Sequence, residues 1–460
     1  MKRNCFPLAV LLLLAATASS QAQFFYTFNA ASTSYIITGY YGPDGSVSIP
    51  EKIDNLYVTG IADYAFYEEN GVTNVTIPSS VTTIGASAFA QTGLTSVTIP
   101  GSVTSIGASA FANCGNLTNA TIEYGVIVIG ASAFNSCPIL AAVTVPSSVI
   151  SIEPYAFTYC LKLTNVTLAS GLISIGDDAF SMTGINSISI PSSVAVIGEE
   201  AFYYCRALTA ITVDVENTNY SSADGVLFDK TQTTLIQYPG GLSGAYTIPS
   251  GVTSIENSTF ANSWSIDSVT IPGSVKSIGE NAFFNCNYLT NLTLANGVGS
   301  IASSAFFGCN GLRSMTIPAS VTNIGADALG IFPLQPSFYF LGDAPSADPL
   351  AFSGVDPGTV YYLPGTTGWS NTLGGLPTAQ WKLPNPVILN STSNFGIQSN
   401  GFGFSISWAT NRPVVVQAST DLANPVWTSL QTNALTNGVF NFTDPQWANY
   451  SGRFYRIIAQ

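Results

Sequence analysis

A short sequence unit recurs along most of the chain, and this repeat constrains the fold more than any other feature. One copy, residues 94–116, has the sequence LTSVTIPGSVTSIGASAFANCGN. The phenylalanine of its SAF element recurs at steps of 22 or 23 residues, apart from one interruption. Its positions are Phe66, Phe89, Phe111, Phe134, Phe157, Phe180, Phe202, Phe260, Phe283 and Phe306, with Leu329 in the eleventh place. Such a period predicts a solenoid in which each unit forms one coil and shares its core with its neighbours.

Each coil has the same internal pattern, which predicts a mainly β structure. Residues 94–99 alternate as L-x-x-V-x-I, so alternate side chains face the core of a strand. Pro100 ends this strand, because proline has no N–H to donate. A second apolar stretch, residues 103–106, leads to Gly107, which permits a turn. We expect the following ASAF element to form a short helical or 3₁₀ turn that places Phe111 in the core.

The pattern I-P-x-S-V-x-x-I-G-x-x-A-F-x-x-C resembles the BspA-type leucine-rich repeat of bacterial secreted and surface proteins. The resemblance covers residues 50–335 and about eleven coils of 22–23 residues. It implies a right-handed solenoid with a role in attachment or protein recognition, and it carries no catalytic residues. Residues 214–247 depart from the period, and we expect them to form an inserted β-hairpin with a bend at Asp224 and Gly225.

The two ends of the chain differ from the repeat. Residues 1–22 have two basic residues, an apolar run and small residues before Ala22, which is the order of a cleaved secretory signal peptide. We therefore expect a secreted or cell-surface protein. Residues 23–49 are predicted to form an N-terminal cap, and residues 336–383 a C-terminal cap or linker. Residues 384–460 contain five short alternating segments, which predict a small antiparallel β-sandwich; they resemble fibronectin-III-like modules of secreted bacterial proteins.

Composition excludes several classes of function. Without residues 1–22 the chain has 25 acidic and ten basic residues, so we expect no nucleic-acid binding. No histidine is present, which removes the commonest general base and metal ligand. No run after the signal peptide reaches transmembrane length. We expect no enzyme activity, cofactor or metal, and the sequence does not indicate the oligomeric state.

A row of hydroxyl side chains forms the candidate binding face. These residues take the outward strand position after the central apolar residue of ten coils. They are Thr76, Thr98, Thr121, Thr144, Thr167, Ser189, Thr212, Thr270, Thr293 and Thr316. Such a face could bind polysaccharide, ice or a protein, although threonine also has a high strand propensity and stacks on itself.

Six cysteines share another repeat position, three residues after the phenylalanine. They are Cys114, Cys137, Cys160, Cys205, Cys286 and Cys309. An exported protein could use them as a disulfide or metal framework. The alternative is a column of buried thiols, favoured because Thr92, Thr183 and Ser263 take the same position in other coils. A bond between adjacent coils is not excluded by distance.

The remaining candidates for chemistry are carboxylate pairs and tryptophans. Adjacent acidic residues occur at 68–69, 177–178 and 199–200, where solvation of a turn explains them better than glycoside hydrolysis does. The function predicted is recognition of a macromolecular partner, a protein more than a polysaccharide, through the sheet faces. The alternative is a polysaccharide-binding accessory protein that uses Trp408, Trp427 and Trp447.

Overall fold

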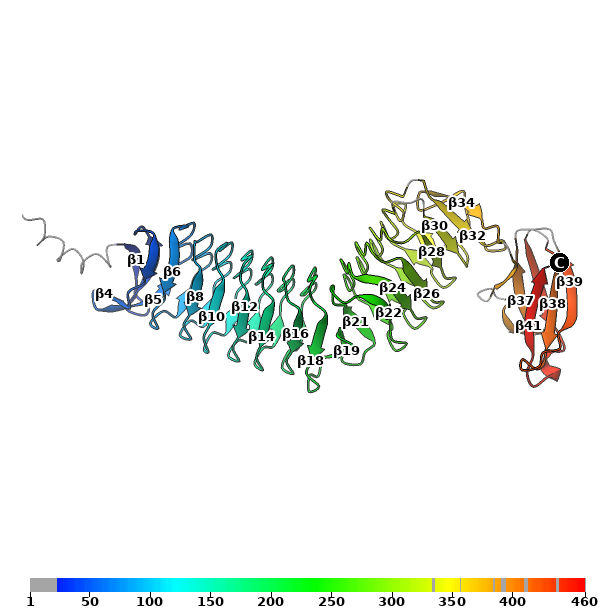
Figure 1. Cartoon of the computed structure of the whole chain (residues 1–460), viewed down its shortest axis with the longest axis horizontal. Helices are drawn as coiled ribbons and strands as arrows, with labels where there is room; N and C mark the ends of the chain where they lie inside the picture. Colours follow the sequence, from blue (N-terminus) through cyan, green and yellow to red (C-terminus); the bar gives the residue numbers. More distant parts are fainter. Residues whose placement is uncertain are drawn as a thin grey trace, which may run out of the picture. The chain divides into compact units, whose positions relative to one another are not determined.

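The computed structural model describes residues 23–332, 336–355, 357–383, 385–389, 394–408, 413–435 and 438–459. The predicted signal peptide, residues 1–22, lies outside them. The chain divides after Leu242 into two compact units, and each is described by itself. Figure 1 shows the strands of the repeat stacked in chain order within each unit. The β-solenoid predicted from the repeat is confirmed.

The longer strands of the first unit form one side of the coils. They are β3 (Gly45–Ser48), β6 (Val72–Thr76), β8 (Ser96–Ile99), β10 (Asn119–Ile122), β12 (Ala142–Val145), β14 (Asn165–Leu168), β16 (Ser187–Ile190) and β18 (Ala210–Val213). Neighbouring strands are parallel and pair equivalent residues, as where Thr121 pairs with Thr98. Pairing joins β3 to β14 in one sheet and β16 to β18 in a second. In β8 the side chains of Val97 and Ile99 are buried and that of Thr98 is exposed, as the alternation predicts.

Short strands form the second side of the same coils. They are β7 (Thr83–Ile84), β9 (Ser105–Ile106), β11 (Val128–Ile129), β13 (Ser151–Ile152), β15 (Ser174–Ile175) and β17 (Val196–Ile197). The N-terminal strands extend this sheet: β1 (Phe24–Asn29) pairs antiparallel with β2 (Ser34–Tyr40), and β2 pairs with β5 (Leu56–Ile61). Strand β5 pairs with β7 and also, antiparallel, with β4 (Lys52–Ile53).

The prediction of helical or 3₁₀ turns at the SAF element is wrong. Ser109 has φ 56°, which no right-handed helix contains. The N–H groups of Ser109 and Phe111 donate to carbonyls of the next coil at 2.8 Å, whereas Ala110 donates three residues back to Gly107. A helix would use every N–H within the coil, so these tight turns gain inter-coil hydrogen bonds instead. The one helix among the described residues is a 3₁₀ turn, Trp447–Asn449.

The insertion in the repeat begins as predicted. Strands β19 (Tyr220–Ala223) and β20 (Val226–Asp229) pair antiparallel around Asp224 and Gly225. A third strand, β21 (Thr234–Gln237), pairs antiparallel with β20 and completes a meander. The Asp229 carboxylate accepts hydrogen bonds from the Thr234 N–H (2.6 Å) and from the hydroxyls of Thr231 and Thr233. Although burial opposes it, these hydrogen bonds lower the pKa of Asp229.

The second unit continues the repeat with the same two kinds of strand. The longer ones are β22 (Gly244–Thr247), β24 (Ile266–Ile271), β26 (Asn291–Leu294), β28 (Ser314–Ile317), β30 (Ser337–Phe340), β32 (Thr359–Tyr362) and β34 (Leu376–Gln380). The short ones are β23 (Ser254–Ile255), β25 (Ser277–Ile278), β27 (Ser300–Ile301), β29 (Asn323–Ile324) and β31 (Ser346–Ala347), with β33 (Thr372–Leu373) paired antiparallel to β34.

The count of eleven coils is too low, and the solenoid has about fourteen turns. The SAF phenylalanine marks only part of the stack. Strand β3 precedes Phe66 and stacks in register on β6. Beyond residue 335, strands β30 and β32 remain parallel and in register with β28, and Phe352 is buried 23 residues after Leu329.

The C-terminal β-sandwich predicted from the alternating segments is confirmed. One sheet contains β35 (Val387–Leu389), β36 (Gly396–Gln398), β37 (Gly401–Ser407) and β40 (Val439–Asp444). The other contains β38 (Pro413–Ser419), β39 (Thr428–Ala434) and β41 (Phe454–Ala459). Phe404 and Trp408 from the first side pack with Val414 and Val416 from the second in a common core.

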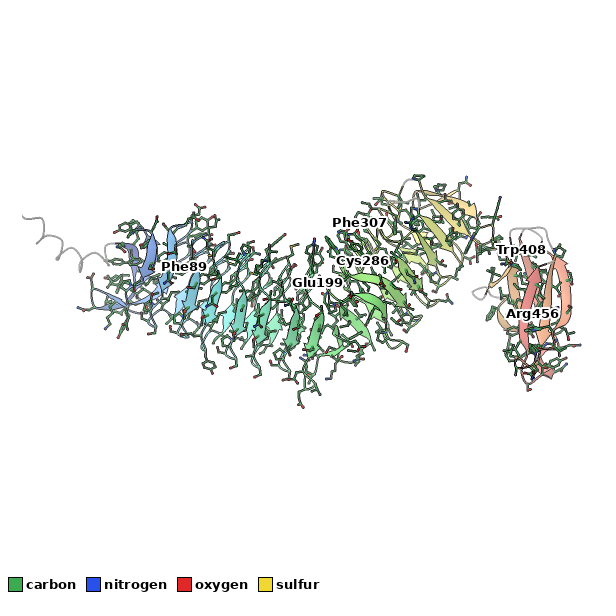
Figure 2. The ribbon with its side chains drawn as sticks, viewed as in Figure 1. Phe89, Glu199, Cys286, Phe307, Trp408 and Arg456 are labelled. Carbon is green, nitrogen blue, oxygen red and sulfur yellow. The ribbon has the colours of Figure 1, made fainter. Side chains whose placement is uncertain are left out.

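A column of stacked phenylalanines runs through the solenoid core. In the first unit the rings of Phe111, Phe134 and Phe157 lie 5.3 Å apart and within 8° of parallel. Phe89, labelled in Figure 2, stacks on Phe111 at 5.2 Å. All of these rings are fully buried, so each coil covers the apolar face of the next.

Candidate functional site

The candidate hydroxyl face lies on the solvent side of the longer strands. In the first unit all seven of its residues, from Thr76 to Thr212, are exposed. Thr98 pairs with Thr121, and Thr144 pairs with Thr167, in adjacent parallel strands. The row is divided between β14 and β16, which belong to different sheets. Parallel strands lie about 4.8 Å apart, so the hydroxyls are regularly spaced.

In the second unit the same row changes from hydroxyl to aromatic side chains. Thr270 is half-buried and pairs with the exposed Thr293. Thr316 is exposed and pairs with Tyr339, whose next partner is Tyr361. The rings of Tyr339 and Tyr361 stack at 5.3 Å, and the sequence analysis did not connect them with the hydroxyl row. Counting 23-residue steps past Thr316 would have placed Tyr339 there.

The residues directly before the short strands form a row of exposed isoleucines that the sequence analysis missed. Ile127, Ile150 and Ile173 are 40%, 42% and 49% exposed, respectively. The N–H of Ile150 donates to the carbonyl of Ile127 at 2.9 Å, and that of Ile173 to Ile150 at 2.8 Å. In earlier coils the same position holds Thr82 and Thr104. An alignment of the coils would have shown this change from threonine to isoleucine at one position of the repeat.

The cysteines form a column of buried free thiols. All six are fully buried, and none of the six forms a disulfide bond. Each thiol donates to the carbonyl oxygen of a phenylalanine, at 3.2 Å from Cys137 to Phe111 and at 3.1 Å from Cys286 to Phe260. Cys286 is labelled in Figure 2. A hydroxyl at the same position is satisfied differently, because Thr92 donates to the carbonyl of Phe89 in its own coil at 2.9 Å.

Burial shields these thiols from reagents in solution. It raises the pKa of Cys205 to about 11, although the hydrogen bond from Thr183 opposes the change. For Cys114 the hydrogen bond to Cys137 and then burial raise the pKa of the thiol. Thiolate is the reactive form of cysteine, so nucleophilic or redox chemistry is disfavoured in the folded chain.

The acidic pairs lie on turns at the edge of the coils. Asp177 accepts a hydrogen bond from the N–H of Glu199 in the next coil at 2.9 Å (Glu199 is labelled in Figure 2). Burial, followed by the charges of Glu200 and Asp177, raises the pKa of Asp178 despite a hydrogen bond from Ser181. The Asp177 carboxylate thus holds the adjacent turn, as a structural residue would.

The three tryptophans of the C-terminal module have different surroundings. Trp408 is 3% exposed and donates its indole N–H to the carbonyl of Leu383 at 3.0 Å, so it cannot stack on a sugar. Trp427 is half-buried, and the guanidinium of Arg456 lies 4.4 Å from its ring centre. Trp447 is half-buried near Phe402. Both Trp408 and Arg456 are labelled in Figure 2.

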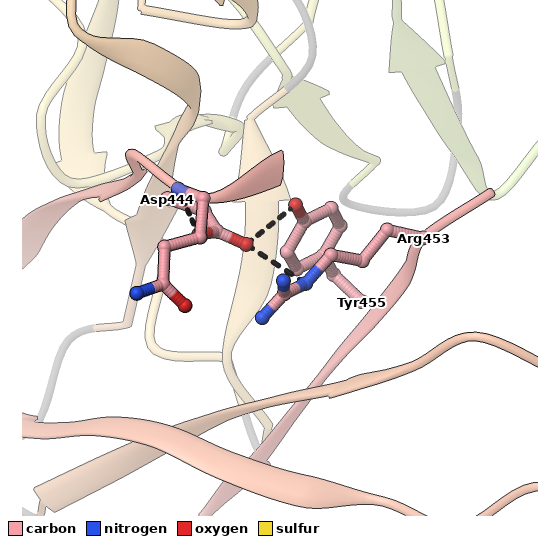
Figure 3. A network of polar contacts seen from close by, with 4 residues as sticks. Asp444, Arg453 and Tyr455 are labelled. Carbon is pink, nitrogen blue, oxygen red and sulfur yellow. Dashed lines mark hydrogen bonds and ion pairs between the residues drawn. The ribbon is translucent and has the colours of Figure 1, made fainter. Parts of the chain in front are cut away.

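A buried ion pair fixes the last turn of this module. The Asp444 carboxylate lies 2.9 Å from Nε of Arg453 and accepts a hydrogen bond of 2.9 Å from the Tyr455 hydroxyl (Figure 3). Burial, and then the hydrogen bond to Asp444, raise the pKa of Tyr455. Asp444 also accepts from the N–H of Gln446 at 2.9 Å. These contacts join the end of β40 to the start of β41.

Metal clusters and membrane-spanning helices are absent from the described ranges. No group of three or more cysteine, aspartate or glutamate side chains there is arranged to hold a metal ion. In the same residues, no helix has both the length and the hydropathy required to span a membrane.

Comparisons with known proteins agree with the repeat. The profile described as "BspA type Leucine rich repeat region" matches residues 46–163, 128–245 and 245–335. A leucine-rich cell surface protein of Faecalibacterium prausnitzii A2-165 is 32% identical with TM-score 0.63, over 74% of this chain and 93% of that one. Pneumococcal vaccine antigen PcpA is 20% identical with TM-score 0.58, over 74% and 92%. A search of curated proteins gave no match.

Proposed function

We propose that this chain, which belongs to the BspA-type leucine-rich repeat family, is a non-enzymatic recognition or adhesion protein. It acts at the surface of a bacterial cell or after secretion, and it binds a macromolecular partner through the sheet faces of its solenoid. The family and the cell-surface relative support the general role. The partner class is our inference from the residues that the faces present.

The observation that carries this proposal is the exposed, in-register hydroxyl row. Thr98, Thr121 and Thr144 all lie on the solvent side of neighbouring strands. A rigid stack holds them at a fixed spacing, so little conformational entropy is lost when a partner binds. The exposed isoleucine row on the other side adds apolar surface, which favours a protein over a fully polar partner.

A charge-introduction variant tests the proposal. The full chain with Thr98→Lys, Thr121→Lys and Thr144→Lys is used beside wild type to capture partners from the native environment. The matched control places three lysines at exposed residues between the two strands of a coil: Ser79→Lys, Ser147→Lys and Ser170→Lys. We expect wild type and the control to retain the same partner and the face variant to lose it. Equal retention by all three proteins would refute the sheet-face proposal.

A second candidate is polysaccharide binding by the C-terminal module. Trp427 supports it, because the residue is partly exposed and the guanidinium of Arg456 lies over its ring. A glycan array with wild type and Trp427→Ala tests this candidate. Saturable binding that disappears in the variant would support it, and the absence of binding would remove it.

A further inference from the structure

One coil of the first unit is a residue shorter than its neighbours, and the shortening leaves a notch. This coil has only Gly184 between the cysteine position, Thr183, and the next buried residue, Ile185. The preceding coil has two residues there, Leu161 and Lys162. The following coil has Arg206 and Ala207. The residues that flank this segment are buried in all three coils, so the coil is shortened in its solvent-facing loop. The backbone approaches closely here, since a Cβ at Gly184 would lie 2.6 Å from the Leu161 carbonyl oxygen.

The notch is the floor of a shallow pocket of about 520 Å³. Tyr159 and Leu161 line one side and are 48% and 56% exposed. Tyr204 and Arg206 line the other side, with Met182 between the two tyrosines. Apolar atoms therefore dominate the lining, and large side chains surround a glycine.

The backbone conformation of the walls is unusual for such side chains. Tyr159, Met182 and Tyr204 occupy the same place in successive coils and have φ of 62°, 56° and 58°. In other coils this place holds asparagine, serine, glycine, glutamate, glutamine or isoleucine, and Asn113, Glu68 and Gln91 have positive φ as well. The conformation therefore belongs to the repeat turn, and this notch differs from the others in the two tyrosines and the methionine that it carries. Hydrogen bonds to the next coil hold these residues, such as that from the Tyr159 N–H to the Ser181 carbonyl at 3.1 Å.

The charge beside the pocket is the reverse of that of the chain. Only ten basic residues follow residue 22, against 25 acidic ones, and two of the ten are Lys162 and Arg206. Lys162 is exposed directly after Leu161. The Arg206 guanidinium lies 4.2 Å from the ring centre of Tyr204. A ligand that fits has an apolar group for the notch and a carboxylate for the basic rim.

We infer that this notch binds a protein segment that places an aromatic side chain between Tyr159 and Tyr204 with a carboxylate beside Arg206. Tyrosine and arginine, together with tryptophan, are enriched at the energetic centres of protein interfaces. The site lies at the edge of the coils and does not require the sheet faces, so it stands independently of the function proposed above.

A second short coil supplies an internal control. Its turn contains Gly93 between Thr92 and Leu94, like Gly184 between Thr183 and Ile185. The residues at the wall positions there are Glu68, Gln91 and Asn113, which are acidic or neutral polar. The Gly93 notch therefore has the same backbone deletion without the apolar walls or the basic rim.

Saturation-transfer NMR with the full chain tests the inference. The probe is the acetylated, amidated tripeptide Asp-Trp-Asp, and the reversed-charge probe is Lys-Trp-Lys. We expect saturable binding of the acidic probe, a loss of about tenfold or more in Arg206→Glu and Tyr204→Asn, and no change in Asn113→Ser at the control notch. Unchanged circular dichroism and thermal midpoint of the variants show that they are folded.

Three results would overturn the inference. The first is no saturable binding of the acidic probe at concentrations up to about 10 mM, which is weaker than any useful recognition. The second is equal binding of the two probes, which would remove the carboxylate from the model of recognition. The third is binding of chitin oligosaccharides, lost in Tyr204→Asn, in place of peptide binding, which would make the notch a sugar site.

Discussion

The thiol of Cys137 donates a hydrogen bond of 3.2 Å to the carbonyl oxygen of Phe111 in the preceding coil, and the same contact recurs from Cys160 to Phe134. This contact satisfies a carbonyl at the centre of the stack without any disulfide. It places each sulfur in a fully buried position, where burial and hydrogen bonding together determine its chemistry.

The thiols are expected to resist alkylation in the folded protein. Burial raises the pKa of Cys205 to about 11, so little thiolate forms at pH 8, and the sulfur has no access to reagent. Iodoacetamide followed by mass spectrometry should label none of the six cysteines in the native chain and all of them in guanidinium chloride. Labelling of native protein at stoichiometric levels, or disulfide-linked peptides from it, would contradict this prediction.

Removal of one ring from the phenylalanine column is expected to destabilise the solenoid strongly. Phe134 is fully buried between Phe111 and Phe157, so Phe134→Ala leaves a cavity and should lower the free energy of unfolding by about 3–5 kcal/mol. Phe134→Leu should cost less, because Leu329 takes the equivalent position in another coil. Urea denaturation measures both; equal losses, or a loss near zero, would show that the column is not a shared core.

Asp178 is expected to destabilise the first unit at neutral pH. Burial and the charges of Glu200 and Asp177 raise its pKa in the folded chain. At pH values between the unfolded and the folded pKa, the folded state therefore binds more protons than the unfolded state. Stability from this group therefore falls as pH rises through its folded pKa. Asp178→Asn should raise the thermal midpoint at pH 7 and have little effect at pH 3, and asparagine tolerates the φ of 52° at this position. A lower midpoint at pH 7 would contradict the argument.

The ion pair in the C-terminal module is expected to hold its last strand. Asp444→Ala leaves Arg453 buried without its carboxylate and removes the acceptor of Tyr455, a change that typically costs about 3–5 kcal/mol. Hydrogen exchange with mass spectrometry should show faster exchange than in wild type in residues 438–459 and an unchanged exchange rate in the solenoid. Arg453→Lys, which keeps the charge, is the control and should show a smaller increase. Unchanged exchange in Asp444→Ala would rule out this role for the pair.

The repeat predicted most of the architecture because each coil states the same pattern independently. The strand of Val97 and Ile99, the buried phenylalanine column and the exposed threonine position all follow from alternation and period alone. The turns did not, because a four-residue ASAF element is compatible with a helical turn until the hydrogen bonds of neighbouring coils are known. Ser109 adopts φ 56° because its N–H can then reach the next coil.

Features that depend on differences between coils were harder to predict. Phe352 and Tyr339 continue columns of the repeat, but the motif around them has changed, so the sequence pattern ends near residue 335 although the coils continue. The pocket at Gly184 depends on a one-residue deletion and on its neighbours in space, Tyr159 and Tyr204. A period that averages over coils hides both kinds of information.

We expect the sheet faces of the solenoid to bind the partner, and the affinity of the full chain for the captured partner measures this. Surface plasmon resonance would compare wild type with the lysine variants of Thr98, Thr121 and Thr144, and with the control at Ser79, Ser147 and Ser170. We expect the dissociation constant of the face variant to be at least about tenfold larger than that of wild type, and that of the control to be unchanged. Equal affinity of the three folded proteins would contradict it.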